Sequence, residues 1–196
     1  MKNYFIIEGA NATGKSTLIE GLKNRNQDIF VSYSIPEDFQ ILRKNTYSIW
    51  SDKASLFYYL SANLELIEKL ETNNKNLIIL DRSIISSFSI YLSRIPEDDW
   101  NSILSIYKEF LKFMPEINKI YILKVNEEIR MLRIKEKSYA EQYSDLKEIK
   151  YENLKDKARL FLVNHSNIDY EEIDTSFLKK NEVINLIYNK INEDKK

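Results

Sequence analysis

The chain has 196 residues, 43% of them hydrophobic, which is enough for one domain with a buried core. Lys and Arg number 29 and Asp and Glu 30, so the net charge of -1 gives no reason to expect nucleic acid or an acidic membrane as a partner. Cysteine is absent, which excludes disulfides and thiolate metal sites, and with no signal-peptide pattern and no apolar run of membrane-spanning length we expect a soluble, cytoplasmic protein.

Short apolar runs typical of buried strands lie at residues 4–7, 29–31, 77–80 and 120–123, with a weaker one at 170–173. Elsewhere, apolar residues recur every three or four positions, which predicts helices. These helices cover residues 16–22, 55–70, 84–92, 100–113 and 183–191. Strands that alternate with helices predict an α/β fold, with a five-stranded parallel sheet flanked by helices in a single domain over residues 1–196.

Residues 9–16 read Gly-Ala-Asn-Ala-Thr-Gly-Lys-Ser, which fits the pattern GxxxxGK[ST]. The motif follows a predicted strand and opens a predicted helix, a context that disfavours a glycine-rich turn without a ligand. Backbone N–H groups of such a loop bind the phosphates of a nucleoside triphosphate. Lys15 would supply a cation to the β and γ phosphates, and the Ser16 hydroxyl would bind the Mg²⁺ that accompanies ATP. The predicted ATP-binding residues of this loop are Gly9, Asn11, Ala12, Thr13, Gly14, Lys15, Ser16 and Thr17.

Asp81 and Arg82 follow the predicted strand at 77–80. Ligands of open α/β folds bind at the carboxyl ends of the strands, so both side chains are expected beside the phosphate loop. Asp81 would bind Mg²⁺ through water, and Arg82 would meet a phosphate directly. In the alternative interpretation, Asp81 caps a helix that starts near Ser83 and Arg82 pairs with a surface carboxylate.

A stretch rich in Lys and Arg occupies residues 130–150, after the fourth predicted strand. Acidic residues alternate with the basic ones, which is typical of a solvated helix face. Beside a phosphate loop the stretch has a second interpretation, as a closing segment that brings a guanidinium group onto the transferring phosphoryl group and excludes water. We expect a short lid around residues 134–148.

Five further short segments of the sequence have a recognisable order and spacing. In chain order they are Glu8-Gly9 before the loop, Leu56-Phe57, Asp81-Arg82 with Ser86, residues 126–137 and residues 173–176. Through their order and spacing, the chain resembles the P-loop nucleoside and nucleotide kinases, with thymidylate kinases nearest and deoxynucleoside kinases next. The resemblance covers nearly the whole chain. It implies ATP-dependent phosphoryl transfer with Mg²⁺ and a homodimeric assembly.

The resemblance also implies an acceptor site. Asn11 replaces a loop acidic residue that touches the acceptor sugar in this family. Phe57 matches the phenylalanine that lies against the acceptor base, and Asn63 stands near a base-reading glutamine. The expected substrate-binding residues are Glu8, Asn11, Arg43, Phe57, Asn63, Arg82, Ser86 and Tyr91.

On the donor side, the resemblance assigns Arg133 and Lys137 to a helix that leads into the lid, and Thr175 to a turn that contacts adenine. These three residues join the ATP site. The expected catalytic residues are Lys15, Asp81, Arg82 and Arg133, and the expected Mg²⁺ ligands are Ser16 and Asp81.

Two departures concern the acceptor phosphate. Thymidylate kinases have Arg-Glu-Pro where this chain has Ser-Ile-Pro at residues 34–36, and Ser61 replaces a further arginine. Both changes remove a cation that would hold a monophosphate. A nucleoside acceptor would instead need a base for its hydroxyl proton, and Glu37 or Glu8 would be the candidates.

The sequence therefore predicts a kinase of a deoxynucleoside monophosphate, with dTMP as the best candidate. A deoxynucleoside kinase is the first alternative. A nucleotide-driven switch or motor is disfavoured on two grounds. The Asn-Lys-x-Asp stretch that recognises guanine is absent. The glycine-rich signature of transporter-type ATPases is excluded too, because the third glycine, Gly21, lies inside the first predicted helix. A degenerate fold that binds nucleotide without turnover is the remaining alternative.

Overall fold

The computed structural model describes residues 2–33, 35–46 and 50–195, without the side chains of residues 42–46, 140, 141, 144, 147 and 148. Within this part of the chain, five parallel strands form one sheet in the order β2-β3-β1-β4-β5. The strands are β1 Asn3–Gly9, β2 Ile29–Tyr33, β3 Leu77–Asp81, β4 Ile117–Lys124 and β5 Tyr170–Asp174. Each contains one of the predicted apolar runs, so the predicted five-stranded parallel sheet is confirmed.

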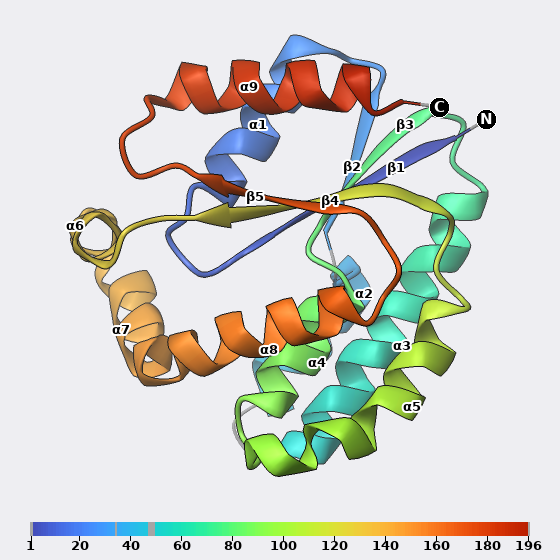
Figure 1. Ribbon diagram of the computed structural model, residues 1–196, viewed down its shortest axis with the longest axis vertical. Helices are drawn as coiled ribbons and strands as arrows, with labels where there is room; N and C mark the ends of the chain where they lie inside the picture. Colours follow the sequence, from blue (N-terminus) through green and yellow to red (C-terminus); the bar gives the residue numbers. More distant parts are fainter. Residues whose placement is uncertain (1, 34, 47–49, 196) are drawn as a thin grey trace.

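Helices cover both faces of the sheet (Figure 1). In the described residues they are α1 Lys15–Arg25, α2 Glu37–Thr46, α3 Asp52–Glu71, α4 Ile84–Leu92, α5 Trp100–Leu111, α6 Glu127–Lys135, α7 Tyr139–Glu148, α8 Glu152–Asn164 and α9 Lys180–Glu193. Helices α1 and α9 pack on one face, and α3, α4, α5 and α8 on the other. Among these helices, none is long and apolar enough to cross a membrane.

The core has two layers because β1 is apolar on both of its faces. Tyr4 and Ile6 pack against α3, α4, α5 and α8, whereas Phe5 and Ile7 pack against α1 and α9. Side chains of a strand alternate between the faces, and a central parallel strand is buried on both sides. This burial is the reason that the strands appear in the sequence as continuous apolar runs.

The periodicity of apolar residues did not predict α2, α6, α7 or α8, and α6 was expected only from the family resemblance. Helix α8 is the instructive case, since its buried residues include the charged Glu152, Lys155 and Arg159. Apolar periodicity assigns such residues to a solvated surface, so the buried face of this helix was hidden.

The sheet brings the two sequence motifs together. Parallel β1 and β3 pair with Ile7 opposite Asp81, and the Arg82 N–H continues the ladder by donating to the Ile7 carbonyl at 3.0 Å. The phosphate loop, residues 9–17, leaves β1 at the same edge. Helices α6 and α7, which contain most of the predicted lid, follow β4 beyond this edge (Figure 1).

Candidate active site

The phosphate loop turns sharply between β1 and α1. Gly9 and Gly14 have φ values of 142° and 96°, in a region that favours glycine, and Ala12 also has a positive φ of 62°. A Cβ on Gly9 would lie only 2.5 Å from the carbonyl oxygen of Leu123 on β4. Gly14 is the N-cap of α1, and among the described residues no side chain caps this helix. Its first N–H groups therefore remain available for an anion.

Lys15 folds back onto the loop that carries it. Its Nζ donates to the carbonyl oxygens of Gly9 at 2.9 Å and Ala10 at 2.6 Å. Burial places the pKa of Lys15 well below its usual range; the Arg82 cation acts in the same direction, and the Asp81 carboxylate opposes it. The ammonium group thus lies at the base of the loop with little solvent around it. Its positive charge is only partly balanced there, so a phosphate bound in the loop would stabilise it.

Asp81 ends β3 beside the loop. Its Oδ1 is buried and has no hydrogen-bond partner among the described residues. Burial raises the pKa of this carboxyl, although the charges of Lys15 and Arg82 act to lower it. No group of three or more His, Cys, Asp or Glu in the described residues forms a metal site on its own. A buried carboxylate oxygen without a partner fits Mg²⁺ that is otherwise held by a hydroxyl, water and phosphates.

The purely structural alternative for the Asp81–Arg82 pair is wrong. Ser83 caps α4 with its own hydroxyl, which accepts from the N–H of Ile85 at 3.2 Å. Arg82 adopts a left-handed backbone with φ of 70°, a conformation that costs a non-glycine residue about 1 kcal/mol. Its Nη2 donates to Asn11 Oδ1 at 2.9 Å and its Nη1 to Ser86 Oγ at 3.1 Å. The guanidinium group therefore faces the phosphate loop.

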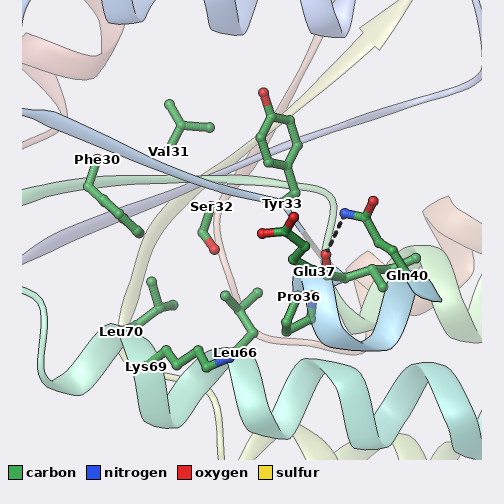
Figure 2. Close-up of a pocket in the computed structure, with 11 residues that line it drawn as sticks. Phe30, Val31, Ser32, Tyr33, Pro36, Glu37, Gln40, Leu66, Lys69 and Leu70 are labelled. Atoms are coloured by element: carbon green, nitrogen blue, oxygen red, sulfur yellow. Dashed lines mark hydrogen bonds between the residues drawn. The ribbon is translucent and has the colours of Figure 1, made fainter. Parts of the chain in front are cut away.

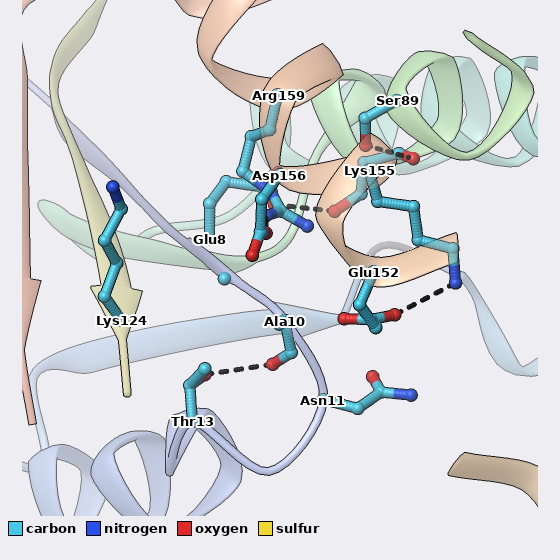
Figure 3. A network of polar contacts seen from close by, with 12 residues as sticks. Glu8, Ala10, Asn11, Thr13, Ser89, Lys124, Glu152, Lys155, Asp156 and Arg159 are labelled. Atoms are coloured by element: carbon cyan, nitrogen blue, oxygen red, sulfur yellow. Dashed lines mark hydrogen bonds and ion pairs between the residues drawn. The ribbon is translucent and has the colours of Figure 1, made fainter. Parts of the chain in front are cut away.

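Glu8 lies behind the loop and is 0% exposed. Its Oε1 accepts from the N–H and hydroxyl of Ser83, both at 3.0 Å, and its Oε2 accepts from Ser86 Oγ at 2.6 Å. Arg159 of α8 approaches the same carboxylate, with Nε 3.6 Å from Oε2, and also pairs with Asp156 (Figure 3). Because these groups occupy the Glu8 carboxylate, this geometry does not favour a direct contact of Glu8 with an acceptor.

A cavity of about 420 Å³ opens in front of these groups. Its lining joins the loop, the end of β3 and α6, and consists of Asn11, Ala12, Gly14, Lys15, Ser16, Thr17, Asp81, Arg82, Arg133, Glu136 and Lys137. The structure thus brings together most of the residues assigned to ATP and Mg²⁺ from the sequence.

Arg133 spans from α6 to two other elements. Its Nη1 donates to the carbonyl of Ala12 at 3.4 Å, and its Nη2 to the carbonyl of Thr175 at 2.8 Å. Thr175 Oγ1 in turn donates to the carbonyl of Thr13 at 3.0 Å. A second hollow of about 210 Å³ begins here, lined by Thr13, Gly14, Thr17, Leu18, Arg133, Thr175, Leu178, Lys180 and Val183. Both hollows share loop residues, so one elongated ligand would fit across them.

The acceptor residues on α3 and α4 do not line these two hollows. Phe57 is 56% exposed, whereas Asn63 is 2% exposed and donates to the Tyr59 carbonyl of its own helix at 2.7 Å. Tyr91 is buried on α4. The side chain of Arg43 lies outside the described residues.

Another hollow, of about 470 Å³, lies at the open edge of the sheet between β2, α2 and α3, and Figure 2 shows its lining. Leu66, Lys69 and Leu70 of α3 line it, together with residues of β2 and α2. Among the described residues it shares none with the phosphate cavity, and it contains Glu37 together with Ile35 and Pro36 of the segment that departs from the family's Arg-Glu-Pro.

Two residues of this region had no motif to mark them. Arg159 and Asp145 are both buried polar residues on helices that the sequence pattern did not predict. For Arg159, the signal in the sequence is the spacing of the charged residues Glu152, Lys155 and Arg159, a pattern that is typical of a solvated helix face.

A family model described as thymidylate kinase matches residues 7–177 of the chain. The chain belongs to the thymidylate kinase family. It is 32% identical over 143 residues to a thymidylate kinase of Nautilia profundicola, covering 69% of this chain and 71% of that protein. The resemblance drawn from the loop, the Asp81-Arg82 pair and the lid motif is confirmed.

Solved structures agree on the fold. A thymidylate kinase from Candida albicans superposes with a TM-score of 0.77 at 17% identity, over 98% of this chain and 93% of that one. A deoxyadenosine kinase from M. mycoides with bound dATP gives a TM-score of 0.66 at 18% identity, over 96% and 99% of the two chains. At these identities the structures establish the architecture of P-loop kinases. The acceptor has to be inferred from the residues of the site.

Proposed function

We propose that the protein transfers the γ-phosphoryl group of ATP to a deoxynucleoside monophosphate, with dTMP as acceptor and dTDP as product. The observation that carries the proposal is the convergence of Lys15, Asp81, Arg82 and Arg133 on one cavity at the carboxyl edge of the sheet. Membership of the thymidylate kinase family supports the choice of acceptor.

On the donor side, the triphosphate would occupy the cavity of about 420 Å³, with its oxygens on the loop N–H groups and the Lys15 ammonium group. The adjoining hollow of about 210 Å³ would take the adenine base, since Leu18, Leu178 and Val183 give it apolar walls. The hydroxyl of Ser16 and the carboxylate of Asp81 would hold Mg²⁺, which neutralises phosphate charge when it is bound.

For the acceptor, Arg82 is the cation in reach, because its guanidinium group is already fixed between Asn11 and Ser86. The exposed ring of Phe57 would stack on the base. An attacking phosphate oxygen is anionic at neutral pH and needs no general base. Catalysis would therefore consist of alignment and charge neutralisation, with Lys15 and Arg133 stabilising the phosphoryl group in transit.

A nucleoside acceptor is the second candidate. It is favoured by Ser61, which stands where the family has an arginine. The Ser61 hydroxyl donates to the Phe57 carbonyl at 3.0 Å, so it supplies no cation for a monophosphate. Against this candidate, neither of the two carboxylates proposed as its base stands free at the loop in the described structure: Glu8 is enclosed, and Glu37 lines a different hollow. The monophosphate remains the better acceptor on this geometry.

The remaining parts of the proposal concern the whole molecule. Residues 1–196 would act as a single domain, and the lid segment, residues 134–148, would close over bound ATP. Support for the closure comes from Lys137, which lies in this segment and lines the phosphate cavity. A homodimer, which the family resemblance implies, is part of the same proposal.

ADP formation with a panel of acceptors tests the function. We expect ADP with dTMP, less with other deoxynucleoside monophosphates and little with nucleosides or without an acceptor. ADP formed without any acceptor would indicate a hydrolase instead. A nucleoside-only response would establish the second candidate, and no ADP with any acceptor, despite ATP binding, would indicate a degenerate nucleotide-binding protein.

A further inference from the structure

The amide of Asn11 is engaged on both of its sides. Its Oδ1 accepts from Arg82 Nη2 at 2.9 Å, and its Nδ2 donates to Asp145 Oδ1 at 2.9 Å. A neutral amide carries both an acceptor and donors, which a carboxylate or an ammonium group does not. Asn11 is therefore suited to connect a cation on one side with an anion on the other.

The anion comes from the lid segment, residues 134–148. Asp145 lies in α7, 134 positions after Asn11 in the sequence, and is 8% exposed. Its second oxygen accepts from Lys137 Nζ at 2.8 Å. Gln142 braces the same turn, because its Nε2 donates to the carbonyls of Lys135 and Lys137. One carboxylate thus fastens both the helix α7 and the lysine that lines the phosphate cavity to the phosphate loop.

On the other side, the contacts continue into the buried centre. Arg82 donates to Ser86, and Ser86 donates to the enclosed carboxylate of Glu8 at 2.6 Å. The guanidinium group of Arg82 therefore has a rigid neighbour in Ser86 and a neighbour in Asn11 that depends on the lid. A change in the position of α7 reaches Arg82 through a single amide.

We propose that Asn11 and Asp145 are positioning residues that couple docking of the lid to the orientation of Arg82 toward the acceptor. The coupling rests on the proposed function, since Arg82 is the acceptor cation there. With Asp145 docked, Asn11 presents its oxygen to Arg82 and fixes the guanidinium group. When α7 leaves, Asn11 loses the partner that orients its amide, and Arg82 loses one of its two fixed acceptors.

The chemistry of the pair predicts a specific pattern of substitutions. Asn11→Asp would place two carboxylates in hydrogen-bond contact, and their repulsion would release α7. Asp145→Asn keeps the size of the side chain but replaces one acceptor oxygen by a donating NH2 group, so it can no longer accept from both Asn11 and Lys137. In the double variant, the loop carboxylate accepts from Arg82 and from the lid amide, whose oxygen still accepts from Lys137. The two substitutions together therefore restore every contact.

The experiment compares wild type, both single variants and the double variant, with Glu128→Gln, an exposed carboxylate of α6, as the control. The first measurement is amide hydrogen exchange of residues 134–148 in the free protein, which does not depend on turnover. The second is steady-state kinetics with ATP and dTMP.

We expect Asn11→Asp to speed exchange of the lid segment about tenfold, because it sets two carboxylates against each other. We expect Asp145→Asn, which leaves the Asn11 amide without a fixed partner, to lower kcat/KM for dTMP about tenfold, the size of one charged hydrogen bond. The double variant should recover most of both losses, and the control should show neither. Unchanged exchange in Asn11→Asp, or a double variant that shows the summed losses of the single ones, would overturn the coupling. If wild type fails to phosphorylate dTMP, the proposed function falls, while the exchange data still test the contact between loop and lid.

Discussion

The carboxylate of Glu8 and the guanidinium group of Arg159 lie 3.6 Å apart, with side chains that are 0% and 3% exposed. Glu8 belongs to β1, directly before the phosphate loop, and Arg159 belongs to α8. The pair therefore joins a helix that carries no sequence motif to the strand that positions the phosphate loop. Since Ser86 bonds to both Glu8 and Arg82, the ion pair also supports the candidate acceptor arginine.

Arg159→Met should destabilise the protein by about 3 kcal/mol, because it leaves the Glu8 carboxylate buried without its cation. Urea unfolding measures the change. Lys157→Met on the exposed face of α8 is the matched control and should change the free energy of unfolding by less than about 0.5 kcal/mol. Equal stabilities of the two variants would show that Arg159 does not hold Glu8.

Asp81→Asn should abolish the effect of Mg²⁺ on ATP binding and lower kcat by at least about a hundredfold, because Asp81 is the proposed carboxylate ligand of the metal. Thermal shift with ATP, with and without Mg²⁺, measures the first effect. Asp169→Asn at an exposed position before β5 is the control. A variant of Asp81 that retains the Mg²⁺-dependent shift would exclude the metal role.

The same substitution makes a prediction about pH. Burial raises the pKa of Asp81 above its ordinary value of 3.8, so in the window between 3.8 and the raised value the folded protein holds a proton that the unfolded chain has lost. This carboxyl therefore contributes a stability that is present at low pH and is lost as the pH rises through the window. The free energy of unfolding should therefore fall less in Asp81→Asn than in wild type as the pH rises through this window. An identical pH dependence in both proteins would contradict the raised pKa.

Phe57→Ala should raise KM for dTMP about tenfold, the amount expected for loss of a stacked ring, and leave stability within about 1 kcal/mol, because the ring is largely exposed. The adjacent Leu56 should instead affect stability, since it is buried in the core between the sheet and α3, α4, α5 and α8. Leu56→Ala should cost about 3 kcal/mol of stability. Acceptor kinetics and urea unfolding on both variants separate the two roles, and an unchanged KM in Phe57→Ala would remove the ring from the acceptor site.

The parts of this protein that the sequence revealed are those with local signals. The strands carry continuous apolar runs because both faces of the sheet are covered, and the phosphate loop requires its glycines for backbone reasons at Gly9 and Gly14. The position of Asp81 beside the phosphate loop could be predicted because it ends an apolar run, at the carboxyl edge of a parallel sheet. Each of these features is encoded within a few consecutive residues.

The residues that the sequence did not predict have partners that are far away in the chain. Arg159 and Asp145 meet Glu8 and Asn11 only after the chain has folded, and neither stands in a recognisable pattern. Charged residues on the buried face of α8 also break the rule that apolar spacing marks the inner side of a helix. Such contacts connect elements rather than define them, so a single sequence gives no signal for them.

The most direct measurement of the central claim is transfer of radiolabel from γ-labelled ATP to dTMP by wild type and by Lys15→Ala. We expect labelled dTDP with wild type in the presence of Mg²⁺, and a rate lower by on the order of 10³ for Lys15→Ala, with the fold intact by circular dichroism. Near-normal transfer by Lys15→Ala, or label that appears only in inorganic phosphate with wild type, would contradict it.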